Sequence, residues 1–180
     1  MVAAREAVIH FAHANGIPSG SYTPVFERLQ PCRVYNLPMF GHNKAFPVND
    51  NWHTLGDELI AYLEASVGRK VIGVGHSMGA IITFLAAIKR PDLFEGILML
   101  DPPVISGRMA FIFRLVKRLG LADRVTPAAQ TMKRRQFWGD YESARAYFSS
   151  KAIYRTFHKE CLDSLLVHAL EDGPSGLIEL

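Results

Sequence analysis

The stretch Lys70-Val-Ile-Gly-Val-Gly-His-Ser-Met-Gly-Ala80 determines how the chain is expected to fold. A short run of apolar, mostly β-branched residues ends at Gly75, and a pattern rich in Ala, Ile and Leu with helical spacing begins directly after Ser77. Very little chain is left between the two patterns for a connection. The stretch therefore predicts a buried strand, a sharp turn and a helix.

The turn Gly75-His-Ser-Met-Gly79 matches the G-x-S-x-G pattern of a nucleophile elbow. In such an elbow, small residues two before and two after the serine let strand and helix approach, while the serine adopts a strained backbone conformation. Its hydroxyl then stands at the positive end of the helix. The alternative is a tight glycine-rich turn in which Ser77 has no chemical role.

The bulk composition limits the class of protein. With 180 residues and 49% hydrophobic content, the chain can bury a sizeable core. No apolar run approaches the roughly 20 residues of a membrane span, and the N-terminus lacks signal-peptide features, so a cytoplasmic protein is predicted. Cys32 and Cys161 are isolated, which indicates neither a disulfide framework nor a metal site. The net charge of +3 is too small to argue for nucleic acid.

Strand-like and helical patterns alternate before and after the elbow. Strands are expected over three further ranges, 7–11, 32–36 and 94–100. Helices are expected over 22–29 and 52–66, the second capped by Asn51 or Asp50 and with Glu58 facing outward. Alternation of this kind, with continuous apolar strands, predicts an α/β fold with a parallel sheet covered by helices on both faces.

The pattern changes after residue 104. Helices are expected over 107–120, 128–137, 140–149 and 159–170, without a new strand. We expect a core over residues 1–105 and, over 106–180, a helical lid inserted after the strand that ends at Leu100. Several aromatic residues of this part either line an apolar pocket or form the core of the lid itself. They are Phe111, Phe113, Phe137, Trp138, Tyr141, Tyr147 and Phe148.

Four segments, in this order and spacing, resemble the α/β-hydrolase fold superfamily, and in particular its esterase-like members with a lid. They are His13-Ala-Asn-Gly16, Gly41-His42, Gly75-His-Ser-Met-Gly79 and Leu98-Met-Leu-Asp-Pro-Pro103. The resemblance implies Ser77 as nucleophile. It also implies an oxyanion hole formed by the backbone N–H groups of Met78 and of Asn15, or its neighbour Ala14.

The same resemblance implies hydrolysis of a small carboxylic ester or thioester through an acyl-enzyme, without a metal or organic cofactor. A carbon–carbon bond hydrolase or lyase of the same fold is an alternative. So is a truncated or non-catalytic remnant that binds a small apolar ligand. If the late strands of the family are missing, an exposed sheet edge is expected, and with it a homo-oligomer.

The chain departs from the family at the acid and the base. Members carry both on loops after later strands, in the order serine, acid, histidine, and this sequence shows no such strands. Either the sequence is the N-terminal portion of a longer hydrolase, or Asp101 acts as the acid with His168 or His158 as the base. Asp101 can equally cap a turn, and His13 and His42 are expected to shape loops rather than to transfer protons.

Overall fold

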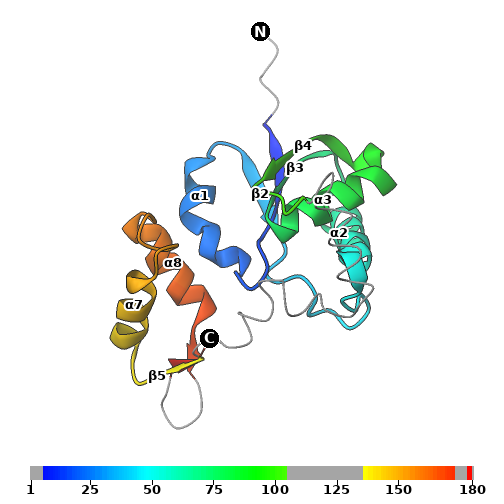
Figure 1. Cartoon of the computed structure of the whole chain (residues 1–180). Helices are drawn as coiled ribbons and strands as arrows, with labels where there is room; N and C mark the ends of the chain where they lie inside the picture. The colour runs from blue at the N-terminus through cyan, green and yellow to red at the C-terminus, as the bar shows by residue number, and fades with distance from the viewer. Residues whose placement is uncertain (1–5, 105–135, 173–177, 180) are drawn as a thin grey trace.

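Four parallel strands form the main sheet of the computed structural model, which describes residues 6–104, 136–172 and 178–179 (Figure 1). The strands run in the spatial order β2-β1-β3-β4. Their bounds are β1 Val8–Ala12, β2 Arg33–Asn36, β3 Val71–His76 and β4 Phe94–Leu100. The predicted parallel sheet is thereby confirmed.

Helices lie on both faces of this sheet, with α1 on one side and α2 and α3 on the other (Figure 1). The α-helices are α1 Thr23–Arg28, α2 His53–Ser66 and α3 Met78–Lys89. Short 3-10 turns precede α1, α2 and β4 and span η1 Ser19–Tyr22, η2 Asp50–Trp52 and η3 Pro91–Leu93. Burying one face against α1 and the other against α2 and α3 explains why the central strands β1 and β3 are largely apolar on both faces.

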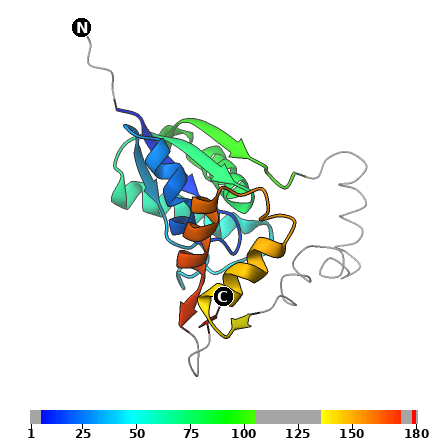
Figure 2. The same cartoon turned by 90° about the vertical axis from the view of Figure 1, so that its left-hand side faces the viewer.

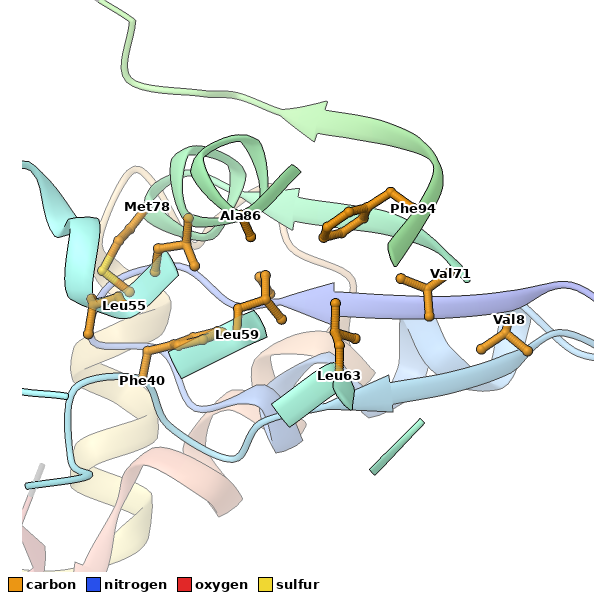
Figure 3. Packing of buried hydrophobic residues seen from close by; sticks show 11 residues of the cluster. Val8, Phe40, Leu55, Leu59, Leu63, Val71, Met78, Ala86 and Phe94 are labelled. Carbon is orange, nitrogen blue, oxygen red and sulfur yellow. The ribbon is translucent and has the colours of Figure 1, made fainter. Parts of the chain in front are cut away.

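The largest core cluster lies between the sheet and the helices α2 and α3 (Figure 3). Leu59 and Leu63 of α2 contribute fully buried side chains, as does Ile82 of α3. Met78, the first residue of α3, also buries its side chain in this cluster, near Leu55 in Figure 3. The first turn of α3 is thus held by packing at the point where the elbow ends.

One expectation about α2 is wrong. The helix begins at His53, and the N–H of Thr54 in its first turn donates to Asn49 Oδ1 at 3.3 Å, while the expected cap at Asn51 or Asp50 stays a prediction. Glu58 does not face outward but is buried. Its carboxylate has a backbone partner outside the helix, which a helical pattern does not reveal.

The C-terminal part contains the helices α7 Tyr141–Ser150 and α8 Lys159–Ala169, as predicted. It also contains a small antiparallel sheet, so the expectation of no further strand was wrong. Its strands are β5 Phe137–Trp138, β6 Glu171–Asp172 and β7 Ile178–Glu179. Strands of two residues are too short to show an alternating pattern. The helix expected over 107–120 lies outside the described residues, as do residues 128–135 of the helix expected over 128–137. The expected end of that second helix was wrong, because residue 137 belongs to β5.

Several aromatic residues of this part pack together in one cluster, whereas Phe137 is exposed. Trp138 and Phe148 are buried with ring centroids 5.5 Å apart, and Tyr147 packs on both. Leucines of α8 complete the cluster. The sequence left open whether these side chains line an apolar pocket or form the core of the C-terminal part. For Trp138, Tyr147 and Phe148 the structure supports the second interpretation, whereas Phe111 and Phe113 lie outside the described residues.

Helix α8 lies beside α1 and η1 in both views (Figures 1 and 2). Arg28 of α1 forms an exposed ion pair with Glu160. Ser164 Oγ donates to the backbone carbonyl of Gly20 at 3.2 Å. Helix α8 therefore packs against the segment that follows β1.

Strand β4 occupies the edge of the main sheet. Residues on both of its faces are exposed, including Ile97 at 37%, Leu98 at 53% and Leu100 at 39%. The edge strand of a sheet carries backbone groups without ladder partners, and apolar residues on it favour pairing with another chain. None of the helices in the described ranges combines the length and the apolar character that crossing a membrane requires.

His10 is fully buried in the middle of β1, and neither of its ring nitrogens has a hydrogen-bond partner among the described residues. Burial and, as the smaller cause, the charge of the neighbouring His13 together lower its pKa from the ordinary 6.5 to about 3. Between the pKa of His10 in the folded chain and its pKa in the unfolded chain, the folded chain therefore binds fewer protons than the unfolded chain. The contribution of His10 to stability is fully present above the unfolded pKa and decreases as the pH falls toward the folded pKa.

We expect His10 to reduce the free energy of unfolding by about 2 kcal/mol between about pH 7.5 and about pH 5. Urea unfolding at the two pH values measures the difference. His10→Leu should remove most of it. Thr83→Val, a non-titrating change in the same buried layer, should leave the difference as in the wild type. An unchanged pH difference in His10→Leu would contradict this assignment.

Candidate active site

The elbow predicted from the sequence is present. Ser77 lies between β3 and α3 with φ 53° and ψ −116°, a backbone conformation that residues other than glycine rarely adopt. Its backbone N–H donates to Leu100 O at 2.9 Å, which ties the turn to the end of β4. Strain of this kind persists only where the surrounding structure imposes it, and it is typical of reactive positions.

The two glycines of the motif are required by contact, not by their own φ angles. A Cβ atom on Gly75 would lie 2.3 Å from the carbonyl oxygen of Gly79. A Cβ atom on Gly79 would lie 2.2 Å from the carbonyl oxygen of Ala12 and 2.6 Å from that of His13. The start of α3 therefore touches both the end of β3 and the loop after β1, and only glycine fits at either place.

Two backbone N–H groups near the elbow are those from which an oxyanion hole is expected. Met78 is the first residue of α3, so its N–H has no partner within the helix. Asn15 lies in the loop after β1, is exposed, and its N–H takes part in no hydrogen bond within the described ranges. The N–H of Ala14, the alternative, donates to the hydroxyl of Tyr22 at 3.2 Å and is occupied.

His13 holds the loop that carries Asn15. Its Nε2 accepts from the N–H of Phe40 at 2.8 Å, and its Nδ1 donates to the carbonyl oxygen of Ala14, also at 2.8 Å. Burial lowers its pKa, so the ring is neutral and can serve as donor and acceptor at once. The expectation that His13 shapes a loop is confirmed.

Glu58 holds the neighbouring loop. Its carboxylate accepts from the N–H of Gly41 at 3.2 Å, next to His42. Burial raises the pKa of Glu58, while this hydrogen bond and the charge of His42 oppose the rise. Tyr22 and Glu58 are the polar residues of this region that sequence reasoning missed. Tyr22 contacts the backbone of Ala14, eight positions away, and Glu58 contacts that of Gly41, 17 positions away, and neither residue belongs to a recognisable motif.

Asp101 follows β4 directly beside the elbow, with φ 45° and an exposed side chain. Its charge raises the pKa of His76, although burial is the larger effect and the net shift is downward. Asp101 is thus close enough to act electrostatically on the residue before Ser77. In the described part of the chain, no hydrogen bond joins it to a histidine.

The two histidines considered as base both belong to α8. His158 is the N-cap residue of the helix. His168 donates from Nδ1 to Ser164 O at 2.8 Å, and its ring packs against Gly20. Within the described ranges neither is hydrogen-bonded to Ser77, so the roles of His168 and His158 stay predictions. No group of three or more His, Cys, Asp or Glu residues suited to a metal occurs in the same ranges.

Comparisons with known proteins identify the family to which the chain is similar. A model of the alpha/beta hydrolase family matches residues 11–177. The chain is 30% identical over 86 residues to pimeloyl-[acyl-carrier protein] methyl ester esterase of Shewanella sp. (strain MR-7), covering 48% of this chain and 31% of that protein. It is 24% identical over 182 residues to type I acyl-CoA thioesterase mpaH of Penicillium brevicompactum, covering 92% and 40%.

Among solved structures, the thioesterase domain from the curacin biosynthetic pathway is similar with a TM-score of 0.66 at 16% identity. That comparison covers 97% of this chain and 63% of the other, and at this identity it shows the fold alone. The chain spans less than half the length of the two curated relatives. The family match extends over most of the sequence, and the chain therefore belongs to the alpha/beta hydrolase family.

Proposed function

We propose that Ser77 is the nucleophile of a serine hydrolase that cleaves a carboxylic ester or thioester of a small molecule. The observation that carries this proposal is the backbone of Ser77, held at φ 53° at the start of α3 by two glycines that admit no Cβ atom. A structure that needed only a tight turn has no reason to place a serine in this conformation. A hydroxyl presented in this way is suited to attack a carbonyl carbon.

The reaction proceeds in two halves. Ser77 Oγ bonds to the carbonyl carbon while its proton passes to a general base, and the carbonyl oxygen becomes an oxyanion. The N–H groups of Met78 and Asn15 donate to this oxyanion. Collapse breaks the bond to the alcohol or thiol, which leaves with the proton from the base. Water then attacks the acyl-enzyme by the same route and releases the acid, so no metal or cofactor is required.

The acid and base remain proposals at Asp101 and His168, with His158 as the alternative base. A second candidate function is supported by one observation: in the described ranges, no histidine is hydrogen-bonded to the hydroxyl of Ser77. A serine without a positioned base is a poor nucleophile. According to this second proposal, the chain binds a small apolar ligand without catalysing its hydrolysis.

The choice of esters and thioesters is supported by two curated relatives, which are named as an esterase and a thioesterase. Turnover of a short p-nitrophenyl ester, an acyl-CoA thioester and a vinylogous diketone by the purified chain tests this choice. We expect hydrolysis of the first two and none of the diketone. Preferential cleavage of the diketone would instead support carbon–carbon bond hydrolysis, and no turnover at all would favour the binding protein.

We also propose that the exposed edge of β4 pairs with a second copy of the chain. Light scattering on the purified 180-residue chain is expected to show a dimer or larger species. Leu98→Lys, which places a charge on the edge, should shift the chain toward monomer. Val167→Lys, at a residue of α8 that is 64% exposed, is the control and should leave the association unchanged. A monomeric wild-type chain contradicts this proposal. Cytoplasmic location and the absence of nucleic-acid binding stay predictions.

A further inference from the structure

The hydroxyl of Tyr22 lies between the two parts of the site that carry the oxyanion donors. It accepts a hydrogen bond from the N–H of Ala14, in the loop after β1, at 3.2 Å. It also lies 2.8 Å from Nδ1 of His76, the residue directly before Ser77. One oxygen atom thus links the loop that carries Asn15 to the elbow.

The protons of this bridge have one arrangement that satisfies every group. The hydroxyl accepts from Ala14, so its own proton is free to be donated to Nδ1 of His76. Burial raises the pKa of Tyr22 to about 12, so the hydroxyl keeps its proton at neutral pH. Burial also lowers the pKa of His76, which keeps the ring neutral and able to accept. His76 then carries its proton on Nε2.

The ring of Tyr22 is fixed independently of its hydroxyl. It packs on Phe11 with ring centroids 4.7 Å apart and on Phe26 at 6.4 Å. The ring of His76 meets it edge-on at 5.9 Å. Tyr22→Phe therefore keeps the packing and removes only the bridge, which leaves the Ala14 N–H and His76 Nδ1 without partners in a partly buried place.

The geometry points to Tyr22 as a positioning residue that sets the separation of the two oxyanion donors. Its bond to Ala14 occupies that N–H and leaves the next one, on Asn15, for the substrate. Its bond to His76 fixes the same loop relative to Ser77 and Met78. This inference rests on the proposed function, because it assigns the bridge a role in binding the oxyanion.

Tyr22→Phe tests the inference, with Tyr62→Phe as the matched control. The hydroxyl of Tyr62 is also partly buried and also has a backbone partner, Asn36 O at 3.1 Å, but it lies away from the elbow. We expect Tyr22→Phe to slow phosphonylation of Ser77 by a fluorophosphonate at least tenfold, because the phosphonyl oxygen occupies the place of the oxyanion. In ester turnover, kcat should fall with little change in KM. Tyr62→Phe should change neither, although it also loses a partly buried hydrogen bond, one where Tyr22→Phe loses two.

Nitrogen-15 NMR of the histidine rings tests the bridge without activity. We expect the Nε2–H tautomer for His76 in the wild type, a mixture of tautomers in Tyr22→Phe, and faster hydrogen exchange at the Ala14 amide in that variant. An Nδ1–H tautomer in the wild type, or unchanged exchange at Ala14, would overturn the bridge. A bridge confirmed by NMR, with unchanged reactivity of Ser77 in Tyr22→Phe, would overturn the positioning role.

The proposed function fails separately from the bridge. A wild-type Ser77 that never reacts with the probe contradicts the serine hydrolase, and with it the positioning role, whatever the state of His76. The NMR result then still decides whether the bridge exists. Failure of the proposed function therefore appears in the labelling of Ser77, and failure of the bridge appears in the NMR spectra.

Discussion

Gly75→Ala is expected to destabilise the folded chain by about 3 kcal/mol or more. The new Cβ atom would lie 2.3 Å from the carbonyl oxygen of Gly79 and 2.5 Å from the N of Ala80. Both neighbours are backbone atoms of the elbow, so no side chain can rotate to relieve the contact. Either β3 or the start of α3 has to shift, and both are packed in the core.

Urea unfolding of Gly75→Ala beside Gly96→Ala measures this effect. Gly96 lies on β4, and a Cβ atom there would meet nothing within 4 Å. The control should change stability by less than about 1 kcal/mol. Because native stabilities are commonly about 5 to 15 kcal/mol, Gly75→Ala can leave part of the chain unfolded even without urea. Equal stabilities for the two variants would contradict the close approach of strand and helix at the elbow.

Ser77→Gly is expected to abolish reactivity and to stabilise the fold at the same time. Loss of a nucleophilic serine reduces turnover by factors on the order of a million in a well-studied protease. The positive φ of Ser77 costs about 1 to 3 kcal/mol, and glycine adopts this backbone conformation without that cost. The greater freedom of glycine in the unfolded chain offsets part of the gain, which leaves about 1 kcal/mol.

Ser77→Ala separates the two effects. It removes the hydroxyl and keeps the strained backbone, so reactivity should be lost while stability stays close to that of the wild type. Thermal unfolding measures the stability of both variants, and labelling with the fluorophosphonate probe measures their reactivity. A less stable Ser77→Gly chain would show that the backbone of Ser77 is not strained, and residual labelling in either variant would show that another residue reacts.

The elbow could be predicted from the sequence because its determinants are local. Gly75, Ser77 and Gly79 are close neighbours in the chain, and the contacts that require glycine are between backbone atoms of the elbow and of β1. The change from a strand-like pattern to a helical one marks the turn. For the same reason, the parallel strands and the helices α1, α2 and α3 were predicted to within a few residues.

What the sequence could not predict depends on contacts between distant residues. Tyr22 and His76 are 54 positions apart, and nothing in the intervening pattern indicates that they meet. Glu58 has the helical spacing of an exposed residue, and only the loop at Gly41 explains its burial. The strands β5, β6 and β7 exist through pairing with each other rather than through any pattern of their own.

The measurement that tests the central claim most directly is reaction of the purified 180-residue chain with a fluorophosphonate, with the modified peptide located by mass spectrometry. The account predicts a single phosphonylated residue, Ser77, and no labelling of a folded Ser77→Ala chain. Labelling at Ser77 would also show that a base is available, and would direct attention to Asp101, His158 and His168. A folded wild-type chain that stays unlabelled, or is labelled at another residue, would contradict the claim that Ser77 is the nucleophile of this chain.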